Sequence, residues 1–130
     1  MKQKYQAVVT GGTRGIGNAI VTKLLSDGCD VIATGTSEKS NRPEGVDYYV
    51  VDFLNESEVN DFVAFLESRR IDILINNAST YTATEVGSIN EDNWHDLIGS
   101  NLKAPTFLSQ AAANELKKNH GCIVNITDMH

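Results

Sequence analysis

The sequence has 130 residues, of which 41% are hydrophobic and 22% are charged, as in a soluble globular domain. This length allows one domain with a sizeable core. The net charge of −6 at pH 7 argues against nucleic acid as a partner, because phosphate binding needs clustered Lys and Arg. No apolar run reaches membrane-spanning length and no apolar signal region follows Met1, so we expect a cytoplasmic protein with no membrane partner.

A glycine-rich stretch over residues 10–17 connects a predicted strand at residues 7–9 to a segment with helical periodicity. A strand, a tight glycine turn and a helix in this order can hold a phosphate. Glycine lets the anion approach the backbone, and the unpaired N–H groups of the helix N-terminus face it. The glycines at 11, 15 and 17 are spaced Gly-x-x-x-Gly-x-Gly, which differs from the commonest dinucleotide fingerprint. A plain structural turn is the alternative, but the flanking strand and helix favour a nucleotide site.

The glycine-linked helix is expected to end at Asp27-Gly28, because glycine suits the position after a helix C-terminus. Asn55 and Asn90 are expected to cap the next two helices, and Asn55 with Glu58 resembles a capping box. A helix break is predicted near residues 99–101, because Pro105 fits best in the first turn of a new helix. Further strands are predicted at residues 31–33, 48–51, 71–75 and 122–126.

Five strands that alternate with helices predict an α/β fold with a doubly wound parallel sheet. Ligands bind such sheets at the carboxyl ends of the strands. That position holds the glycine turn, Asp52, residues 76–79 and Asp128, so the sequence predicts a nucleotide site there. Asn is also common in plain turns, which is the alternative for Asn76 and Asn77.

Two cysteines, Cys29 and Cys122, are too few for a disulfide framework or a metal-ligand cluster. Each lies at the start of a predicted strand, where a thiol behaves as a small apolar group. We therefore expect two reduced, buried thiols. Trp94 lies on an apolar helical stripe and is expected in the core, whereas His95 and His120 are expected at the surface.

Together, these motifs resemble the classical short-chain dehydrogenase/reductases, and the resemblance covers all 130 residues. It implies a Rossmann-like NAD(P)-binding domain over residues 1–130, with five strands present of the usual seven. The resemblance implies that Asp52 contacts the adenine, that residues 76–78 match an Asn-Asn-Ala-Gly motif at the nicotinamide end, and that Asn101 is a structural and catalytic Asn. The cofactor-binding residues expected from it are Thr10, Gly11, Thr13, Arg14, Gly15, Ile16, Gly17, Thr34, Thr36, Ser37, Asp52, Phe53, Asn77, Ala78 and Ser79.

Two departures from the family pattern are similar to the pteridine reductase branch, which reduces pterins with NADPH. Ser79 replaces the glycine of the Asn-Asn-Ala-Gly motif, and Asp128 stands where most of the family has its catalytic Ser. The resemblance implies that Asp128 hydrogen-bonds or protonates the pterin, because a carboxyl group in an apolar site can stay protonated. The alternative is that Asp128 is a solvated turn residue. Tyr81 either lines a substrate pocket or packs within its loop.

A third departure concerns the Tyr-x-x-x-Lys pair, which the family carries downstream of the fifth strand. No Tyr among the 130 residues is followed by Lys four positions on. We therefore expect the chain to be the cofactor-binding half of an enzyme, a truncated product, or a non-catalytic remnant.

The choice between NADPH and NADH is predicted from the end of the second strand, where NAD-dependent enzymes place an acid. Thr34, Thr36 and Ser37 occupy this region, and the nearest acid, Glu38, follows them. The Arg14 guanidinium and the Thr36 and Ser37 hydroxyls suit a 2′-phosphate, so NADPH is favoured. NADH, with Glu38 on a ribose hydroxyl, is the alternative.

The sequence thus predicts an NADPH-dependent reductase of a small-molecule substrate, with a pterin as the first candidate. A 3-oxoacyl-carrier-protein or other ketone reductase is an alternative, and so is a nucleotide-binding module without catalysis. Family members are usually tetramers. We therefore expect a homo-oligomer, tetramer or dimer, of the full-length protein, with the helix over residues 103–118 in a subunit interface.

Overall fold

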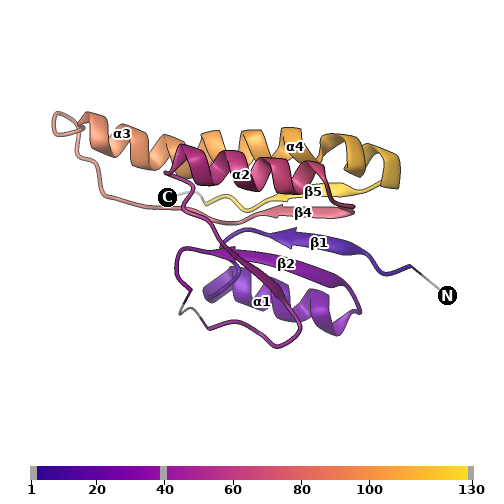
Figure 1. The fold of residues 1–130 in the computed structure, drawn as a ribbon. Helices are drawn as coiled ribbons and strands as arrows, with labels where there is room; N and C mark the ends of the chain where they lie inside the picture. The colour runs from indigo at the N-terminus through magenta and orange to yellow at the C-terminus, as the bar shows by residue number, and fades with distance from the viewer. Residues whose placement is uncertain (1–2, 39–40, 129–130) are drawn as a thin grey trace.

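The computed structural model describes residues 3–38 and 41–128. It contains a five-stranded parallel sheet in the order β3-β2-β1-β4-β5, and this confirms the predicted doubly wound α/β fold (Figure 1). The strands are β1 (Gln6–Val9), β2 (Asp30–Gly35), β3 (Asp47–Val50), β4 (Ile73–Asn76) and β5 (Cys122–Asn125).

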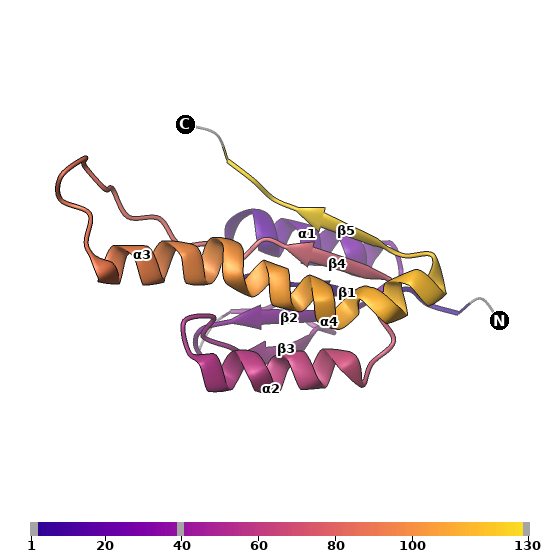
Figure 2. The same cartoon turned by 90° about the horizontal axis from the view of Figure 1, so that it is seen from above.

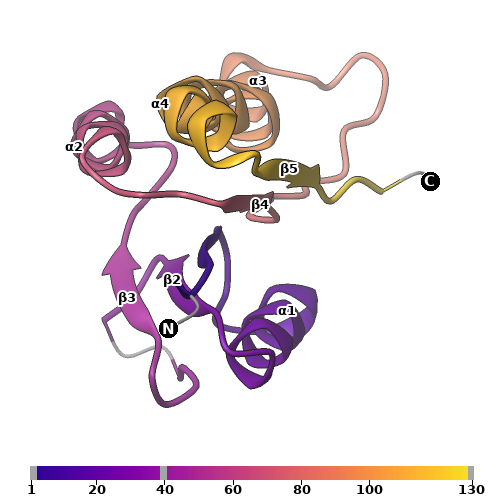
Figure 3. The ribbon, with the colours of Figure 1, turned by 90° about the vertical axis from the view of Figure 1, so that its right-hand side faces the viewer.

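The α-helices of the described residues are α1 (Gly15–Ser26), α2 (Glu56–Glu67), α3 (Glu91–Ile98) and α4 (Ala104–Asn119). Figure 3 shows α1 on one face of the sheet and α2 with α4 on the other. Alternate residues of β1 pack into the two cores, because successive strand side chains point to opposite faces. Val9 packs with Val21 of α1, and Val8 packs with Leu66 and Leu108 of the opposite layer. No helix in the described ranges is long and apolar enough to cross a membrane.

Both predicted asparagine caps are present. The Asn55 side chain accepts a hydrogen bond from the Glu58 N–H at 3.2 Å, at the start of α2. Asn90 and Asn93 cap α3 reciprocally, at 2.9 and 3.2 Å between side-chain oxygen and backbone nitrogen. The Glu58 side chain does not return the hydrogen bond to Asn55 as in a capping box. Its carboxylate accepts from the Asp52 N–H at 3.3 Å and so holds the end of the preceding loop.

The predicted interruption near residues 99–101 is present as a change of helix type: α3 ends at Ile98 and α4 begins at Ala104, but no gap separates them. Residues Gly99–Lys103 form a π-helical turn, η1, so that the two helices continue as one rod (Figure 2). The Ala104 N–H donates to the Gly99 carbonyl, five residues back. Pro105 lies in the first turn of α4, as expected from its missing N–H. Weak helix formers at Gly99 and Asn101 thus change the helical hydrogen bonding without ending the helix.

Two predicted burials are wrong. Trp94 is 59% exposed, because α3 extends past the sheet and has no layer beneath it there (Figure 2). Cys122 is exposed on the outermost strand β5, and Cys29 is half-buried; both thiols are free. His95 and His120 are exposed, as expected.

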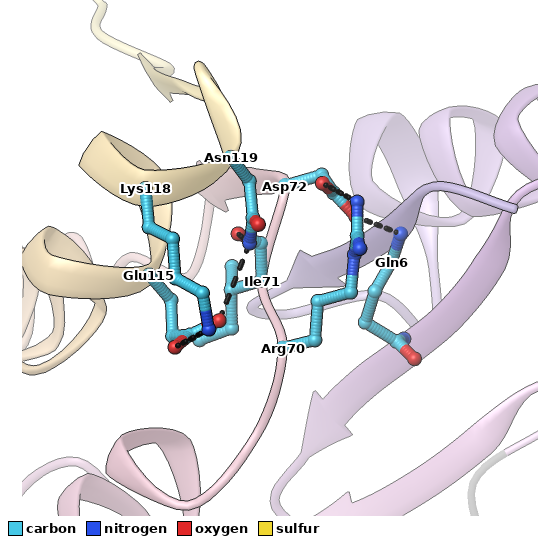
Figure 4. A network of polar contacts seen from close by, with 7 residues as sticks. All are labelled: Gln6, Arg70, Ile71, Asp72, Glu115, Lys118 and Asn119. Carbon is cyan, nitrogen blue, oxygen red and sulfur yellow. Dashed lines mark hydrogen bonds and ion pairs between the residues drawn. The ribbon is translucent and has the colours of Figure 1, made fainter. Parts of the chain in front are cut away.

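The amino ends of β1 and β4 are joined by Asp72, a carboxylate whose side chain is 3% exposed. It accepts a hydrogen bond from the Gln6 N–H at 2.8 Å (Figure 4). The Arg70 guanidinium donates to both carboxylate oxygens, at 3.1 and 2.9 Å. The Asn119 amide of α4 donates to the Ile71 carbonyl beside it at 3.1 Å, so α4 is tied to the same end.

Burial of the Asp72 carboxyl group would by itself raise its pKa. Hydrogen bonds from Arg70 and the Gln6 N–H outweigh that effect and hold the pKa of Asp72 below its ordinary value. The same hydrogen bond raises the pKa of Arg70. The ion pair is therefore formed over the whole physiological pH range.

Candidate nucleotide-binding site

The carboxyl ends of β1 and β4 border the point where the chain connections diverge. From β1 the chain runs through α1 on one face, whereas α2, which precedes β4, lies on the other face. At such a point the two connections leave a crevice above the strand ends, where doubly wound sheets bind ligands. The glycine turn and the 76–79 segment lie at this crevice.

The glycine turn is compact because its glycines approach other backbone atoms closely. Gly11 and Gly15 have φ values of +64° and +54°, which side chains disfavour. A Cβ on Gly17 would overlap the Gly11 carbonyl oxygen and lie 2.5 Å from the Asn77 amide nitrogen. A Cβ on Gly11 would lie 2.9 Å from the Ala78 Cα. Glycine is therefore required at 11 and 17 for the turn to pack against the end of β4.

Thr34 supports the turn from beneath. It is fully buried, and its hydroxyl accepts a hydrogen bond from the Gly11 N–H at 3.2 Å. Its carbonyl accepts from the Gly12 N–H at 2.9 Å. The structure thus places the Thr34 side chain beneath the turn, where it holds the backbone of the expected cofactor site, and a direct contact of Thr34 with the cofactor stays a prediction.

Thr10 and Asn77 tie the turn to the end of β4. The buried Thr10 hydroxyl accepts from the N–H groups of Asn77 and Ala78, at 3.0 and 2.9 Å. The Asn77 amide donates to the carbonyls of Thr10 and Gly11, both at 3.1 Å. These uncharged contacts position the turn. The family resemblance implies that the Asn-Asn-Ala motif stabilises the central sheet, and the structure adds its partners, Thr10 and Gly11, which lie 67 and 66 residues away along the chain.

The open side of the turn is the N-terminus of α1. Its N-cap residue, Arg14, makes no side-chain hydrogen bond to the first turn, and that turn has no acidic residue. Arg14, Gly15 and Ile16 are exposed, and Thr13 is half-buried. The N–H groups and the positive end of the helix dipole therefore face solvent, as an anion requires.

The ends of β2 and β3 continue this surface. Thr36 and Ser37 are exposed directly after β2, and Asp52 is exposed after β3. One Asp52 oxygen accepts from the Leu54 N–H at 2.9 Å, which leaves its other oxygen for a further donor. Phe53 packs its ring against Phe62 of α2, with centroids 6.4 Å apart.

The segment after β4 is held by the π-helical turn. Asn101 accepts from the Thr80 N–H at 3.0 Å and donates to the Thr80 carbonyl at 2.8 Å, which engages both ends of its amide. The hydroxyls of Thr80 and Ser100 lie 2.6 Å apart. Ser79, which precedes Thr80, is exposed. The structure thus brings Asn101 to the predicted nicotinamide end.

Asn76 lies in a buried polar cluster behind this segment. Its amide donates to the Ser109 hydroxyl of α4 at 3.1 Å and to the Asn125 side-chain oxygen of β5 at 2.9 Å. This cluster joins β4, β5 and α4 and indicates a structural role for Asn76. Asp128 is exposed beyond β5, on a tail that leads away from the sheet (Figure 2).

These observations fit a dinucleotide. The glycine positions leave room for a pyrophosphate at α1, and exposed polar groups flank it on both sides. Among the described residues no group of three or more His, Cys, Asp or Glu is placed to hold a metal ion.

Comparison with known proteins identifies the family. The sequence model described as short chain dehydrogenase matches residues 5–130. The chain belongs to this family. A relative from Haemophilus influenzae, the 3-oxoacyl-[acyl-carrier-protein] reductase FabG, is 37% identical over 131 residues, which are 92% of this chain and 53% of that protein. The chain thus spans about half the length of the curated relatives it matches.

Two solved structures that share the fold are complexes with nicotinamide cofactors, and the first is of the short chain dehydrogenase/reductase family. An oxidoreductase from Brucella ovis in complex with a partially ordered NAD matches with a TM-score of 0.84 at 27% identity, over 96% of this chain and 63% of that one. A blue fluorescent protein from a metagenomic library in complex with NADPH matches with a TM-score of 0.80 at 29% identity, over 93% and 54%. Nicotinamide cofactors of both types thus occur among the structural relatives.

Proposed function

We propose that this chain binds a nicotinamide adenine dinucleotide and forms the cofactor-binding half of an NAD(P)-dependent oxidoreductase. The observation that carries the proposal is the glycine turn, packed against β4 with the N-terminus of α1 left open. The pyrophosphate would lie on the N–H groups of residues 13–17. Asp52 and the backbone of Phe53 would contact the adenine. Asn77, Ala78 and Ser79 would border the nicotinamide.

The bound cofactor supplies a hydride for reduction of a carbonyl or imine carbon. The chain's own residues hold and orient the reacting groups. Asn101 fixes Thr80, and with it the segment that borders the nicotinamide. The Asn101 amide uses one N–H and one lone pair of its oxygen on Thr80, so its second N–H is left for a further hydrogen bond at the site.

We infer that NADPH is the preferred cofactor. The exposed Arg14 side chain lies at the start of α1, and the exposed Thr36 and Ser37 follow β2, where the adenosine ribose is expected. A guanidinium forms strong, directional hydrogen bonds with phosphate oxygens. NADH binding with Glu38 on the ribose is the competing proposal.

The substrate that we favour is a ketone such as a 3-oxoacyl thioester, because a relative that matches nearly the whole chain carries that activity in its name. A pterin is the second candidate for the substrate. The observation behind it is Asp128, a carboxyl group that follows β5 at the carboxyl end of the sheet. Turnover by the full-length protein separates them: NADPH oxidation with an acetoacetyl thioester but not with a dihydropterin supports the ketone. Saturable NADPH binding without turnover of either supports a non-catalytic module.

We also propose a homo-oligomer in the cytoplasm, in which a second copy packs on the α3–α4 rod. Exposed apolar residues gather there, with a hollow of about 650 Å³ between the rod and α2. Leu54, which precedes α2, and Trp94 and Phe107 of the rod are exposed and line this hollow, and Leu102 is exposed elsewhere on the rod. Light scattering of the full-length protein, with and without Trp94→Glu, tests the proposal.

Cofactor binding is tested with a pair of glycine variants. Gly15 and Gly28 both have positive φ, and a Cβ on either would meet no atom within 4 Å. Gly15→Glu places a carboxylate where the pyrophosphate is expected, whereas Gly28→Glu places one at the other end of α1. We expect NADPH affinity, measured by calorimetry, to fall more than about tenfold in Gly15→Glu only. Equal affinities in the two variants would contradict the proposal.

A further inference from the structure

Two arginines stack on aromatic rings in the described part of the chain. The Arg42 guanidinium carbon lies 4.5 Å from the centroid of the Tyr48 ring, and that of Arg69 lies 4.6 Å from the centroid of Phe65. Arg69 follows α2 and leads toward the amino end of β4. Arg42 follows β2 and belongs to the surface that borders the glycine turn.

Tyr48 is placed at that surface by the register of β2 and β3. It pairs with Ala33, which packs against Val21 of α1, so its side chain lies on the α1 face of the sheet. Its ring reaches toward the carboxyl end, where the hydroxyl donates to the Ser37 carbonyl at 2.6 Å. The ring that carries Arg42 therefore also holds the turn that follows β2.

Gly35 shows how closely this ring approaches the glycine turn. A Cβ on Gly35 would overlap the Tyr48 hydroxyl and lie 2.8 Å from the Thr13 methyl group. Tyr48 and Thr13 therefore flank the same small space at the end of β2. The Arg42–Tyr48 pair and the expected pyrophosphate site are adjacent parts of one surface.

We propose that Arg42, stacked on Tyr48, is the residue that selects a phosphate on the adenosine ribose, and that Tyr48 is its positioning residue. This rests on the proposed binding of a nicotinamide dinucleotide. Stacking on a ring face orients the guanidinium and leaves the N–H groups at its edge for phosphate oxygens. A stacked side chain also loses less rotamer freedom when it binds. Arg42 would add a second guanidinium to that of Arg14 at the expected ribose phosphate.

The test measures the affinities of NADPH and NADH, and of adenosine 2′,5′-bisphosphate and AMP, which differ from each other in the 2′-phosphate. We expect Arg42→Gln to reduce the preference for the phosphorylated ligand of each pair about tenfold, because the affinity for that ligand falls. NADH and AMP affinities should stay unchanged. Arg69→Gln is the matched control, because it removes the other stacked arginine; it should change neither affinity.

Tyr48 is tested by two variants that separate the ring from the hydroxyl. Tyr48→Phe keeps the stacking surface and loses the bond to Ser37, so the preference should fall less than in Arg42→Gln. Tyr48→Leu removes the ring, so the preference should fall as far as in Arg42→Gln. Arg42→Lys, which keeps the charge, should retain part of the preference. A merely structural role would lower NADH affinity equally.

Three results would overturn this inference, and each of them contradicts a different part of the argument. If Arg42→Gln keeps the preference while Arg14→Gln loses it, Arg14 alone selects the phosphate and NADPH specificity stands. If the wild-type protein binds NADPH and NADH equally, the phosphate selection fails while dinucleotide binding stands. If it binds neither, the proposed function fails as well.

Discussion

The two ends of the sheet use polar groups in opposite ways. At the amino end, Asp72 accepts three hydrogen bonds from Gln6 and Arg70, so its charge is fully engaged within the protein. At the carboxyl end, Thr10 and Thr34 hold the glycine turn with uncharged groups. Both ends therefore contribute to stability, but only the amino end uses charge for it, and the carboxyl end keeps its positive potential for a ligand.

This difference shows why a site can be rigid and still attract an anion. A carboxylate holding the glycine turn would neutralise the N-terminus of α1 and compete with a pyrophosphate. Hydroxyl and amide groups supply geometry without charge. The comparison predicts that a variant at the amino end lowers stability alone, whereas a variant at the carboxyl end lowers nucleotide affinity as well.

The largest effect is expected for Gly17→Ala. The added methyl group would overlap the Gly11 carbonyl and press on the Asn77 amide, so the turn must move. We expect the free energy of unfolding to fall by about 3 kcal/mol and nucleotide binding to be lost. Denaturant unfolding and calorimetry measure the two quantities. Gly28→Ala is the control, because its Cβ meets open space; binding in this variant should persist.

Asp72→Asn should lower the free energy of unfolding by about 2 kcal/mol and leave nucleotide affinity unchanged. The variant keeps the shape but loses the charge that engages Arg70, and a buried group loses its best partners. Denaturant unfolding in parallel with NADPH titration checks both expectations. A loss of affinity equal to that of Gly17→Ala would contradict the division between the two ends.

The same carboxylate predicts an acid dependence. The folded-state pKa of Asp72 is lower than its ordinary value of 3.8. Its contribution is therefore complete above the unfolded pKa and is lost as the pH falls through the lower folded pKa. Unfolding curves from pH 6 to about 2 should show a smaller loss of stability in Asp72→Asn than in the wild type. Equal slopes would contradict the assignment.

Thr10→Val should cost about 1–2 kcal/mol, since it removes the acceptor of the Asn77 and Ala78 N–H groups without changing side-chain shape greatly. The turn and the end of β4 would then be free to separate, so NADPH affinity should also fall. Denaturant unfolding and calorimetry again give both values. An unchanged affinity would show that the hydroxyl contributes only to folding.

The smallest effect is expected for Asn90→Ala. It removes the cap of α3, a helix that extends past the sheet, and should cost about 1 kcal/mol. NADPH affinity should stay unchanged, since the cap lies at the far end of α3 from Asn101. Thermal unfolding compared with Asn55→Ala, which removes the α2 cap, measures the difference.

Sequence patterns predicted what depends on neighbours along the chain. The strands, the two asparagine caps and the phosphate-type turn follow from local periodicity and glycine spacing. Trp94 was misplaced because an apolar stripe predicts a face to be covered without saying what covers it. Cys122 was misplaced because a strand at the border of the sheet has one side without a neighbour.

The parts of the site that were missed depend on contacts distant along the chain. Thr10 and Thr34 are predicted cofactor residues, and the structure adds that both are buried and hold backbone groups of the turn. Their partners lie in other strands, so no local pattern could distinguish a supporting hydroxyl from an exposed one. The Arg42–Tyr48 contact depends on the course of the loop between β2 and β3, which composition does not determine.

The π-helical turn η1 contains one residue more than an α-helical turn would need between the same two helices. Deleting one residue within Gly99–Lys103 would restore regular α-helical hydrogen bonding and rotate α3 by about 100° relative to α4. Asn101 would then no longer face Thr80, although α4 would keep its buried side. The extra residue therefore changes which side of the helix faces each neighbour. One side of α4 packs on the sheet, and a different side of the same rod, at η1, binds the loop after β4.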